Sequence, residues 1–257
     1  MSLRARRRVL LKVLLEPAVD TFIVLTPSGA EDLHRRHGIR PDRIALVPLG
    51  IDASSDPDPA DRAALCAELG IPAGALLVAH VGALTARKGH RFLVEALSRL
   101  PDLLKAKNVH VLFVGGGEER EALERRVSQA GLVGRIHFLG HRDDARRIIG
   151  LIDLLVLPSL IETQPFSILE AMSAGTAVLA TAIFGVPDLV VSGQTGLLVA
   201  PGEVGPLAGA LAELLDDPSR RRNLGAGGRR RFLDRFTLDR MAEGTERVYL
   251  GLTGTAS

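Results

Sequence analysis

The central part of the chain, between residues 74 and 200, alternates short apolar runs with longer amphipathic ones. The apolar runs are "ALLVAHVGA", "VHVLFVGGG", "RIHFLG", "IDLLVLPS", "TAVLATA" and "TGLLVAPG", and helical patterns such as "HRFLVEALSRL" and "EEREALERRVSQAG" lie between them. Strands that are apolar on both faces and separated by helices of about ten residues indicate a parallel sheet covered on both sides. The pattern therefore predicts an α/β fold with a doubly wound, Rossmann-like parallel sheet.

After Pro201 the pattern becomes helical to the end of the chain. Three segments have helical periodicity, namely "EVGPLAGALAELLDD", "PSRRRNLGAGGRRRFLDRF" and "TLDRMAEGTERVYLGL". Thr237, followed by Asp239 and an apolar periodicity through Val248, predicts a capped terminal helix.

The first 50 residues supply too few strands for a domain. They read as a helix, the strand "DTFIVLT", the helix "SGAEDLHRRHG" and the strand "RIALVPLG". Two parallel strands alone cannot bury both of their faces. The following "IDASSDPDPADR" is rich in Pro, Asp and Ser, which is typical of a linker. We therefore expect residues 1–53 to be the remnant of a largely missing N-terminal domain, and residues 54–257 to form the Rossmann-like domain and its C-terminal helix.

Composition narrows the class of protein. With 46% hydrophobic and 24% charged residues, the chain is typical of a globular protein. Its single cysteine excludes an internal disulfide, and no apolar run approaches the roughly 20 residues that cross a bilayer. We expect a cytoplasmic protein. Residues 3–15 predict a basic amphipathic helix, which either exposes its arginines to solvent or lies on anionic lipid as a peripheral attachment to the inner membrane.

Charge and aromatic content bear on the ligands. The formal net charge is +2, and no sustained basic stripe interleaved with aromatic residues is present, so we expect no nucleic-acid partner. The chain has no Trp and one Tyr. Any sugar bound here would therefore be held by polar groups rather than by stacked aromatic rings.

The loops that leave the strands are the places to look for a site, because ligands of doubly wound sheets bind outside the carboxyl ends of the strands. In "VGALTARKGH", Gly82 allows a tight turn, and Lys88 lies just before a helix whose positive end would also attract an anion. A solvated lysine is the plain alternative. A cation at a helix start is mildly unfavourable, however, which favours a role in binding an anion.

Two further loops carry weaker signals. In "FVGGGEEREA", Gly115 and Gly116 let the backbone approach a ligand, but no G-x-G-x-x-G follows and Glu118 would repel phosphate. A dinucleotide fingerprint is not expected there, and a tight turn and a ligand contact are equally open. The loop "IFGVPDLVVSGQTG" reads as two turns, whose backbone amides can still contact a phosphate or a sugar.

The loop and helix "PSLIETQPFSILEAMSAG" hold the strongest candidates. Pro165 suits the first position of a helix, with Thr163 or Gln164 near the cap. The next three amides would then be unpaired and able to hold a pyrophosphate; they belong to Phe166, Ser167 and Ile168.

Two glutamates accompany that helix. Glu170 lies within its first two turns on an otherwise apolar surface, where an unpaired carboxylate would be costly to bury. Two neighbouring ribose hydroxyls would satisfy both of its oxygens, whereas a nearby arginine would do so without any ligand, and these readings are equally open. Glu162, before the helix, would reach a different part of the same ligand.

Together these loops resemble the nucleotide-sugar-binding half of a family 4 glycosyltransferase, an enzyme of the two-domain GT-B architecture. The resemblance extends from about residue 20 to about residue 250. Its most specific part is "PSLIETQPFSILEAMSAGTAVLAT", in which Glu162 and Glu170 have the E-x7-E spacing of the family.

The resemblance implies roles for individual residues. Lys88 matches the lysine on the donor diphosphate, Glu162 the glutamate near the donor sugar, and Glu170 the one on the ribose. The start of the helix would hold the phosphates, and the loop at Gly140 and His141 would receive the base. The residues implied to contact the donor are Gly82, Lys88, Gly115, Gly116, Gly140, His141, Glu162, Phe166, Ser167, Ile168 and Glu170, with Lys88 and Glu162 implied to be catalytic.

The resemblance also implies a reaction. Family members transfer a sugar from a nucleotide sugar with retention at the anomeric carbon, through an oxocarbenium-like transition state in which charge builds on the departing diphosphate. We expect no cofactor and no metal ion, because Lys88 and the helix amides would stabilise the leaving group. The D-x-D of Asp56 and Asp58 lies in the linker and is poorly placed for a metal at the sheet edge.

The sequence departs from the family at three points. Ala83 stands where the family usually has an arginine, which should weaken diphosphate binding, although Arg87 is close in sequence. The family's "E-G-F-G" is here "ETQPF", and its "G-G-x-P-E" is here "FGVPD", so that Phe184 either crowds the sugar or packs.

Other functions fit the same pattern. The chain as given would bind a nucleotide sugar without turning it over, as a binding module or a truncated chain, unless a partner chain supplies the acceptor domain. Another GT-B enzyme, such as a nucleotide-sugar epimerase, is a further alternative. The base, the donor sugar and the acceptor, whether sugar, lipid or small molecule, are left undetermined by the sequence.

Overall fold

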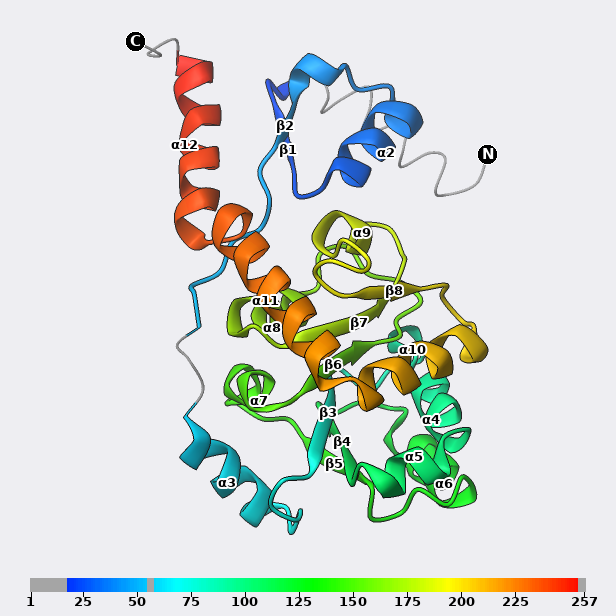
Figure 1. The fold of residues 1–257 in the computed structure, drawn as a ribbon. Helices are drawn as coiled ribbons and strands as arrows, with labels where there is room; N and C mark the ends of the chain where they lie inside the picture. The colour runs from blue at the N-terminus through cyan, green and yellow to red at the C-terminus, as the bar shows by residue number, and fades with distance from the viewer. Residues whose placement is uncertain (1–17, 55–57, 254–257) are drawn as a thin grey trace, which may run out of the picture.

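A six-stranded parallel sheet forms the centre of the molecule (Figure 1). The computed structural model describes residues 18–54 and 58–253. The strands are β3 (Leu76–Val81), β4 (Val109–Val114), β5 (Ile136–Gly140), β6 (Leu154–Leu157), β7 (Ala177–Thr181) and β8 (Leu197–Val199). Their spatial order is β5-β4-β3-β6-β7-β8, so the direction of winding reverses between β3 and β6. This confirms the predicted doubly wound α/β fold.

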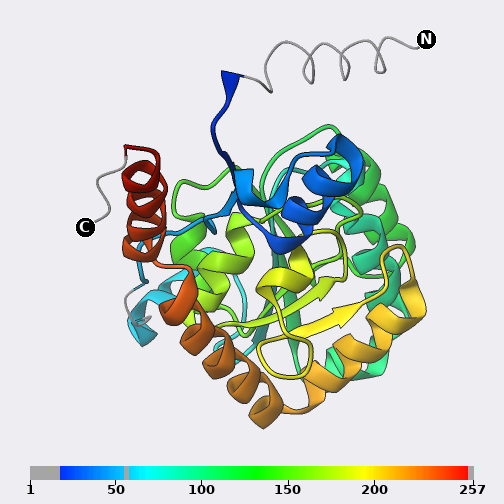
Figure 2. The same cartoon turned by 90° about the horizontal axis from the view of Figure 1, so that it is seen from above.

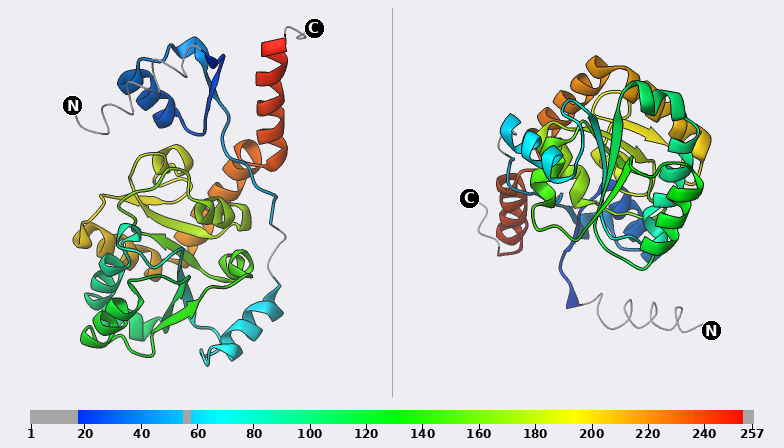
Figure 3. Two further views of the ribbon diagram at one scale, coloured as in Figure 1. Left: turned by 180° about the vertical axis from the view of Figure 1, so that it is seen from behind. Right: turned by 90° about the horizontal axis from the view of Figure 1, so that it is seen from below.

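Helices cover both faces of the sheet (Figure 3). One cluster of core residues joins the sheet to α4 (His90–Ser98), α5 (Pro101–Ala106), α6 (Arg120–Gln129) and α10 (Val204–Asp216). The other joins it to α3 (Pro59–Glu68), α7 (Ala145–Leu151), α8 (Phe166–Ala174) and the end of α11 (Pro218–Arg235). Side chains on both faces of β3, such as Leu77 and Val78, are completely buried. The apolar runs of the sequence reflect this burial.

Three helices were not predicted. The segment read as a linker already turns helical at Pro59, because the Asp58 carboxylate accepts a hydrogen bond from the amide of Ala60 (2.8 Å) and caps α3. The short helices α5 and α9 (Val186–Leu189) each begin with a proline in their first turn. A linker prediction for residues 51–62 is therefore wrong in its second half.

A small amino-terminal unit, residues 18–51, precedes the sheet. Strands β1 (Phe22–Val24) and β2 (Ile44–Leu46) pair in parallel, and α2 (Pro27–His37) connects them. The predicted helix within residues 3–15 lies outside the described residues. The unit lies above α9 and alongside α12 (Leu238–Thr253), as Figures 1 and 2 show.

The terminal helix ties the two parts together. Thr237 caps α12, as predicted, by accepting a hydrogen bond from the amide of Arg240 (3.3 Å). The backbone of Ile51 bonds to Phe236 and Leu238, each at 3.0 Å, where the chain passes from the amino-terminal unit to the sheet. Within residues 18–54 and 58–253, no helix combines the length and the apolar character needed to span a membrane.

Candidate functional site

The loops predicted to form the site meet at the carboxyl edge of the sheet, around the point where the strand order reverses. Lys88 follows β3 and Glu162 follows β6, the two neighbouring strands on either side of this point. Doubly wound sheets bind ligands at such a topological switch point.

Lys88 and Glu162 form a buried ion pair. The Nζ of Lys88 lies 2.5 Å from the Oε1 of Glu162, and their side chains are only 12% and 8% exposed. The hydroxyl of Ser159 donates to the same carboxylate oxygen at 3.0 Å. Taking two charges out of water is costly, and such pairs contribute little to stability. This favours a functional reason for the pair.

The backbone around Lys88 is built for this contact. Gly89 has a φ of +72°, and a Cβ atom there would lie 2.0 Å from the carbonyl oxygen of Pro158 at the end of β6. No other residue fits such a close approach. The amide of Leu160 also donates to the carbonyl of Arg87 at 2.7 Å. The loops that carry Lys88 and Glu162 are thus fixed to each other through their backbones.

The predicted glycines pack side by side. Gly115 donates its amide to the carbonyl of Gly140 at 2.7 Å, and a Cβ on Gly115 would lie 2.1 Å from the carbonyl oxygen of Gly82. Gly116 accepts a hydrogen bond from the amide of Leu84 at 2.9 Å. This edge of the sheet is therefore lined by backbone, which lets a ligand come close.

His141 lies apart from these contacts. Its side chain is 87% exposed, and its Nε2 lies 3.4 Å from the carboxylate of Asp143. Its expected role near the base stays a prediction.

The start of α8 differs from the predicted one in two ways. Pro165 is the N-cap rather than the first helical residue, so α8 begins at Phe166. The amide of Ile168 is not unpaired, because it donates to the carbonyl of Pro165 at 3.2 Å. The amides of Phe166 and Ser167 have no hydrogen-bond partner among the residues that the structure describes. Two amides, not three, are thus available to an anion.

Glu170 lies half-buried in α8. Burial raises the pKa of its carboxyl, and the charge of Arg146 partly opposes that shift. The alternative that an arginine neutralises Glu170 is not realised, since no ion pair to Glu170 occurs in the described part of the chain. Arg146 instead donates to the backbone carbonyl of Asp52. A carboxylate in this position still needs hydroxyl donors.

Sequence reasoning missed the contacts that join the amino-terminal unit to the site loops. The hydroxyl and the amide of Ser28, at the start of α2, both donate to the Asp188 carboxylate, at 2.7 and 3.1 Å. The Gln164 side chain accepts from the amide of Leu49 at 3.2 Å. No local sequence pattern predicts such contacts, because the residues are far apart in the sequence.

The loop after β7 is more structured than two plain turns, because it contains α9. Phe184 has a φ of +33°, which is strained for a residue with a side chain, and it is 48% exposed. It therefore does not pack in the core.

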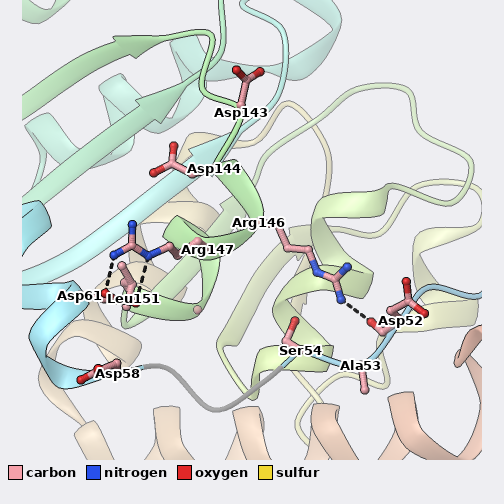
Figure 4. A pocket seen from close by; sticks show the side chains of 11 residues that line it. Asp52, Ala53, Ser54, Asp58, Asp61, Asp143, Asp144, Arg146, Arg147 and Leu151 are labelled. Atoms are coloured by element: carbon pink, nitrogen blue, oxygen red, sulfur yellow. Dashed lines mark hydrogen bonds and ion pairs between the residues drawn. The ribbon is translucent and has the colours of Figure 1, made fainter.

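A cavity of about 600 Å³ lies elsewhere, between α7, the start of α3 and residues 52–54 (Figure 4). None of the predicted site residues lines it. Its wall carries five aspartates and two arginines; Asp61 pairs with Arg147 of the wall, and Asp144 pairs with Arg142 outside it. The excess of carboxylates would repel a diphosphate. The predicted site residues thus lie at the sheet edge, away from this cavity.

The described residues contain no cluster of three or more His, Cys, Asp or Glu side chains suited to a metal ion. Of the D-x-D pair, Asp58 caps α3, and Asp56 lies outside the described residues.

Comparisons with known proteins agree with this architecture. The chain is 33% identical over 227 residues to a D-inositol 3-phosphate glycosyltransferase of Corynebacterium glutamicum, covering 85% of this chain and 54% of that protein. It is 31% identical over 251 residues to an alpha-maltose-1-phosphate synthase of Mycolicibacterium smegmatis, covering 90% and 63%. The chain thus spans between half and two thirds of the length of these relatives.

A solved structure, Alr3699/HepE of Anabaena in complex with UDP, shares the fold with a TM-score of 0.84 at 24% identity, covering 99% of this chain and 70% of that one. The family model described as glycosyl transferases group 1 matches residues 61–231, which include β3 to β8 and every predicted site residue. The chain belongs to the group 1 glycosyltransferase family.

Proposed function

We propose that this chain forms the nucleotide-sugar-binding half of a glycosyltransferase that transfers a sugar with retention of the anomeric configuration. One observation carries the proposal, which is the buried pair of Lys88 and Glu162 at the switch point of the sheet. A charged pair kept out of water at the place where parallel sheets bind nucleotides is an expected feature of a binding site.

Lys88 would bind and stabilise the diphosphate leaving group. Its ammonium has three donors, of which Glu162 uses one, so it can also donate to a diphosphate. The free amides of Phe166 and Ser167, at the positive end of α8, would hold the same anion. Charge that builds on the diphosphate as the sugar departs would meet these donors without a metal ion. Glu162 would then face the sugar.

Glu170 and the glycine loops would hold the nucleoside. The half-buried Glu170 carboxylate lacks an ion-pair partner in the described residues, and two ribose hydroxyls would supply donors. The backbone at Gly140 would contact the base, and the guanidinium of Arg120 approaches the same glycine. Because the structure that shares this fold holds UDP, uracil is the first base to test.

The acceptor side would come from outside the described residues. Apolar side chains on or directly after the β1–β2 strands, those of Ile23, Leu25 and Leu46, are 41–47% exposed. Parallel strands are normally covered on both faces. We propose that a further domain, carried by a partner chain or by more of the same polypeptide, covers this face and binds the acceptor in the cytoplasm.

A second candidate function is nucleotide-sugar binding without turnover. It is favoured by Ala83, which is exposed at the position of the arginine expected from the family. Release of free nucleotide from UDP-, GDP- and ADP-sugars in the presence of candidate acceptors would separate an enzyme from a binding module.

Calorimetric titration with UDP, GDP and ADP tests the site. Replacing Lys88 by Met should weaken binding of the preferred nucleotide by about 10- to 100-fold, the range for hydrogen bonds to charged groups. Lys107→Met is a matched control, since Lys107 pairs with Asp216 and lies before β4, at the opposite edge of the sheet. Melting curves should show both variants folded. If none of the three nucleotides binds the wild-type chain, the proposed function is wrong.

A further inference from the structure

Two histidines stack inside the molecule directly beneath the loop that carries Lys88. His80 lies on β3 and His90 is the first residue of α4. Their ring centroids are 3.7 Å apart with an interplanar angle of 30°, and the two residues are 0% and 2% exposed. Phe113 of β4 meets both rings edge-on, at 6.3 and 5.1 Å. The imidazoles thus occupy places in the core that apolar side chains would normally fill.

Most of the polar atoms of this pair are unpaired. The Nδ1 of His80 and both ring nitrogens of His90 have no hydrogen-bond partner among the described residues. Buried polar atoms without partners are costly, and each such case calls for an explanation. Within the part of the chain that the structure describes, the one side-chain hydrogen bond of the pair runs from the Nε2 of His80 to the backbone carbonyl of Lys88, at 3.2 Å. Because a carbonyl can only accept, His80 is the donor and carries its proton on Nε2.

This hydrogen bond holds Lys88, the residue proposed to bind the diphosphate. The Lys88 amide donates to the carbonyl of Thr85 at 3.0 Å, so the His80 bond fixes the other end of the same residue. The Lys88 side chain and the His80 ring also both border the space next to Gly82. A Cβ placed on Gly82 would lie 3.4 Å from the Cε of Lys88 and 3.5 Å from the Cε1 of His80. His80 therefore holds the backbone of Lys88 directly, next to the place where the lysine side chain begins its path to Glu162.

We propose that His80 is a positioning residue, which holds Lys88 where its ammonium can meet the diphosphate of a nucleotide, while the stacked ring of His90 fixes the orientation of the His80 imidazole. The inference rests on the proposed function, because it needs a diphosphate at Lys88. His80 does not touch the ligand. Its effect is to reduce the freedom of a flexible lysine, so that less entropy is lost when the anion binds.

A second pair of histidines, His110 and His137, bond to each other instead of to a site loop. The Nδ1 of His110 on β4 and the Nε2 of His137 on β5 lie 3.0 Å apart and bond to each other. Their ring centroids are 5.3 Å apart, and among the described residues neither side chain bonds to a loop at the carboxyl edge. This pair therefore offers a control with the same chemistry at another place in the sheet.

The experiment compares His80→Phe with His110→Phe. Phenylalanine keeps an aromatic ring in the core, somewhat larger than imidazole, and removes both ring nitrogens, including the one that donates to Lys88. Affinities for UDP, GDP and ADP, and for the corresponding nucleosides, are measured by calorimetry, and melting curves are recorded for each variant. We expect His80→Phe to weaken binding of the preferred diphosphate by about three- to tenfold, the equivalent of one neutral hydrogen bond. Nucleoside binding should not change, and His110→Phe should change neither.

Two further variants test whether the loss of affinity comes from the hydrogen bond between His80 and Lys88. In His80→Gln, the amide can still donate toward the Lys88 carbonyl, so affinity for the diphosphate should recover at least in part. In the Lys88→Met background, His80→Phe should cause no further loss, because the two residues act as a unit.

The outcomes separate this inference from the proposed function. If the wild-type chain binds a nucleoside diphosphate and His80→Phe binds it equally well, the positioning role is wrong and the proposed function stands. An equal loss of nucleoside and diphosphate binding would also overturn the positioning role, since it would mark a general disturbance of the fold. Absence of binding by the wild-type chain would overturn both.

Discussion

The sheet domain and the amino-terminal unit are built from the same kinds of element but differ in burial. In the sheet domain, Leu77, Val78 and Ala79 on β3 are each 0% exposed. In the amino-terminal unit, no residue of β1, β2 or α2 is buried, and Ile23 and Leu46 are nearly half exposed. The sheet domain therefore carries large core clusters, whereas Ile39 and Val47 are the buried apolar residues within the described part of the amino-terminal unit, residues 18–51.

The difference shows what holds each region in place. Six strands covered by helices on both faces are stabilised by apolar burial. The amino-terminal unit is attached by a few polar contacts, such as Ser28 with Asp188, and by packing against α12. We expect substitutions in the sheet domain to change global stability, and substitutions in the amino-terminal unit to change local opening.

The largest effect is expected from the polar groups that the sheet domain buries. Burial, and to a smaller degree the charge of Lys88, lowers the pKa of His90 from 6.5 to about 4. Between pH 6.5 and pH 4, His90 is protonated in the unfolded chain but still neutral in the folded one. The free energy of unfolding therefore falls as the pH is lowered through this range. The loss from His90 alone is about 3 kcal/mol. Urea unfolding at pH 7.5 and at pH 4.5 should show most of it.

His90→Phe is the matched variant for this prediction. It should unfold with a smaller dependence on pH, because the phenyl ring does not titrate. His80, whose pKa burial also lowers, keeps part of the slope. Glu170 acts in the opposite sense, since its raised pKa favours the folded state as the pH falls, but it is the same in both proteins. Identical pH profiles for His90→Phe and the wild type would contradict this account.

A smaller and more local effect is expected at Asp188. Asp188→Ala removes the carboxylate that accepts two hydrogen bonds at the start of α2, at a cost of about 1–2 kcal/mol. Amide hydrogen exchange in α2 should become about 5- to 30-fold faster, while exchange in α8 should not change. Asp234→Ala is the control, because that carboxylate lies in an exposed ion pair on α11. Equal acceleration of α2 and α8 would mean that the two regions open together.

The sequence predicts the sheet domain well, because its signals are local. The central strands β3, β4, β6 and β7 are apolar runs buried on both faces, and the glycine at position 89 marks a turn that no other residue can make. Lys88 and Glu162 also meet at one edge of the sheet, because the carboxyl ends of parallel strands lie together there, and their roles toward a ligand stay predictions.

What the sequence did not predict depends on contacts between distant residues. Nothing near Ser28 indicates that its hydroxyl bonds to Asp188, 160 positions later. The stacking of His80 on His90 could not be predicted from the sequence either, because a histidine in an apolar run can be buried for many reasons. The helix α3 was missed for a different reason, because Pro and Asp are typical both of linkers and of helix starts.

The smallest effect is expected on the exposed face of the amino-terminal unit, where two adjacent residues can be compared. Leu46 is 47% exposed, whereas Val47 is 4% exposed and lies where α12 passes at Gly244. Val47→Ala should lower the free energy of unfolding by about 1–2 kcal/mol, because it leaves a cavity against α12. Leu46→Ala should change it by less than about 0.5 kcal/mol, because little buried surface is lost.

Chemical unfolding of both variants, followed by circular dichroism, measures this difference. A Leu46→Ala variant that unfolds as easily as Val47→Ala would show that the β1–β2 face is already covered in the purified protein, either by a second copy or from within the same chain. Repeating the measurement over a hundredfold range of protein concentration separates these two cases, because only a second copy makes stability depend on concentration. If Leu46→Ala is neutral throughout, the face is free to receive the acceptor-binding domain that the proposed function requires.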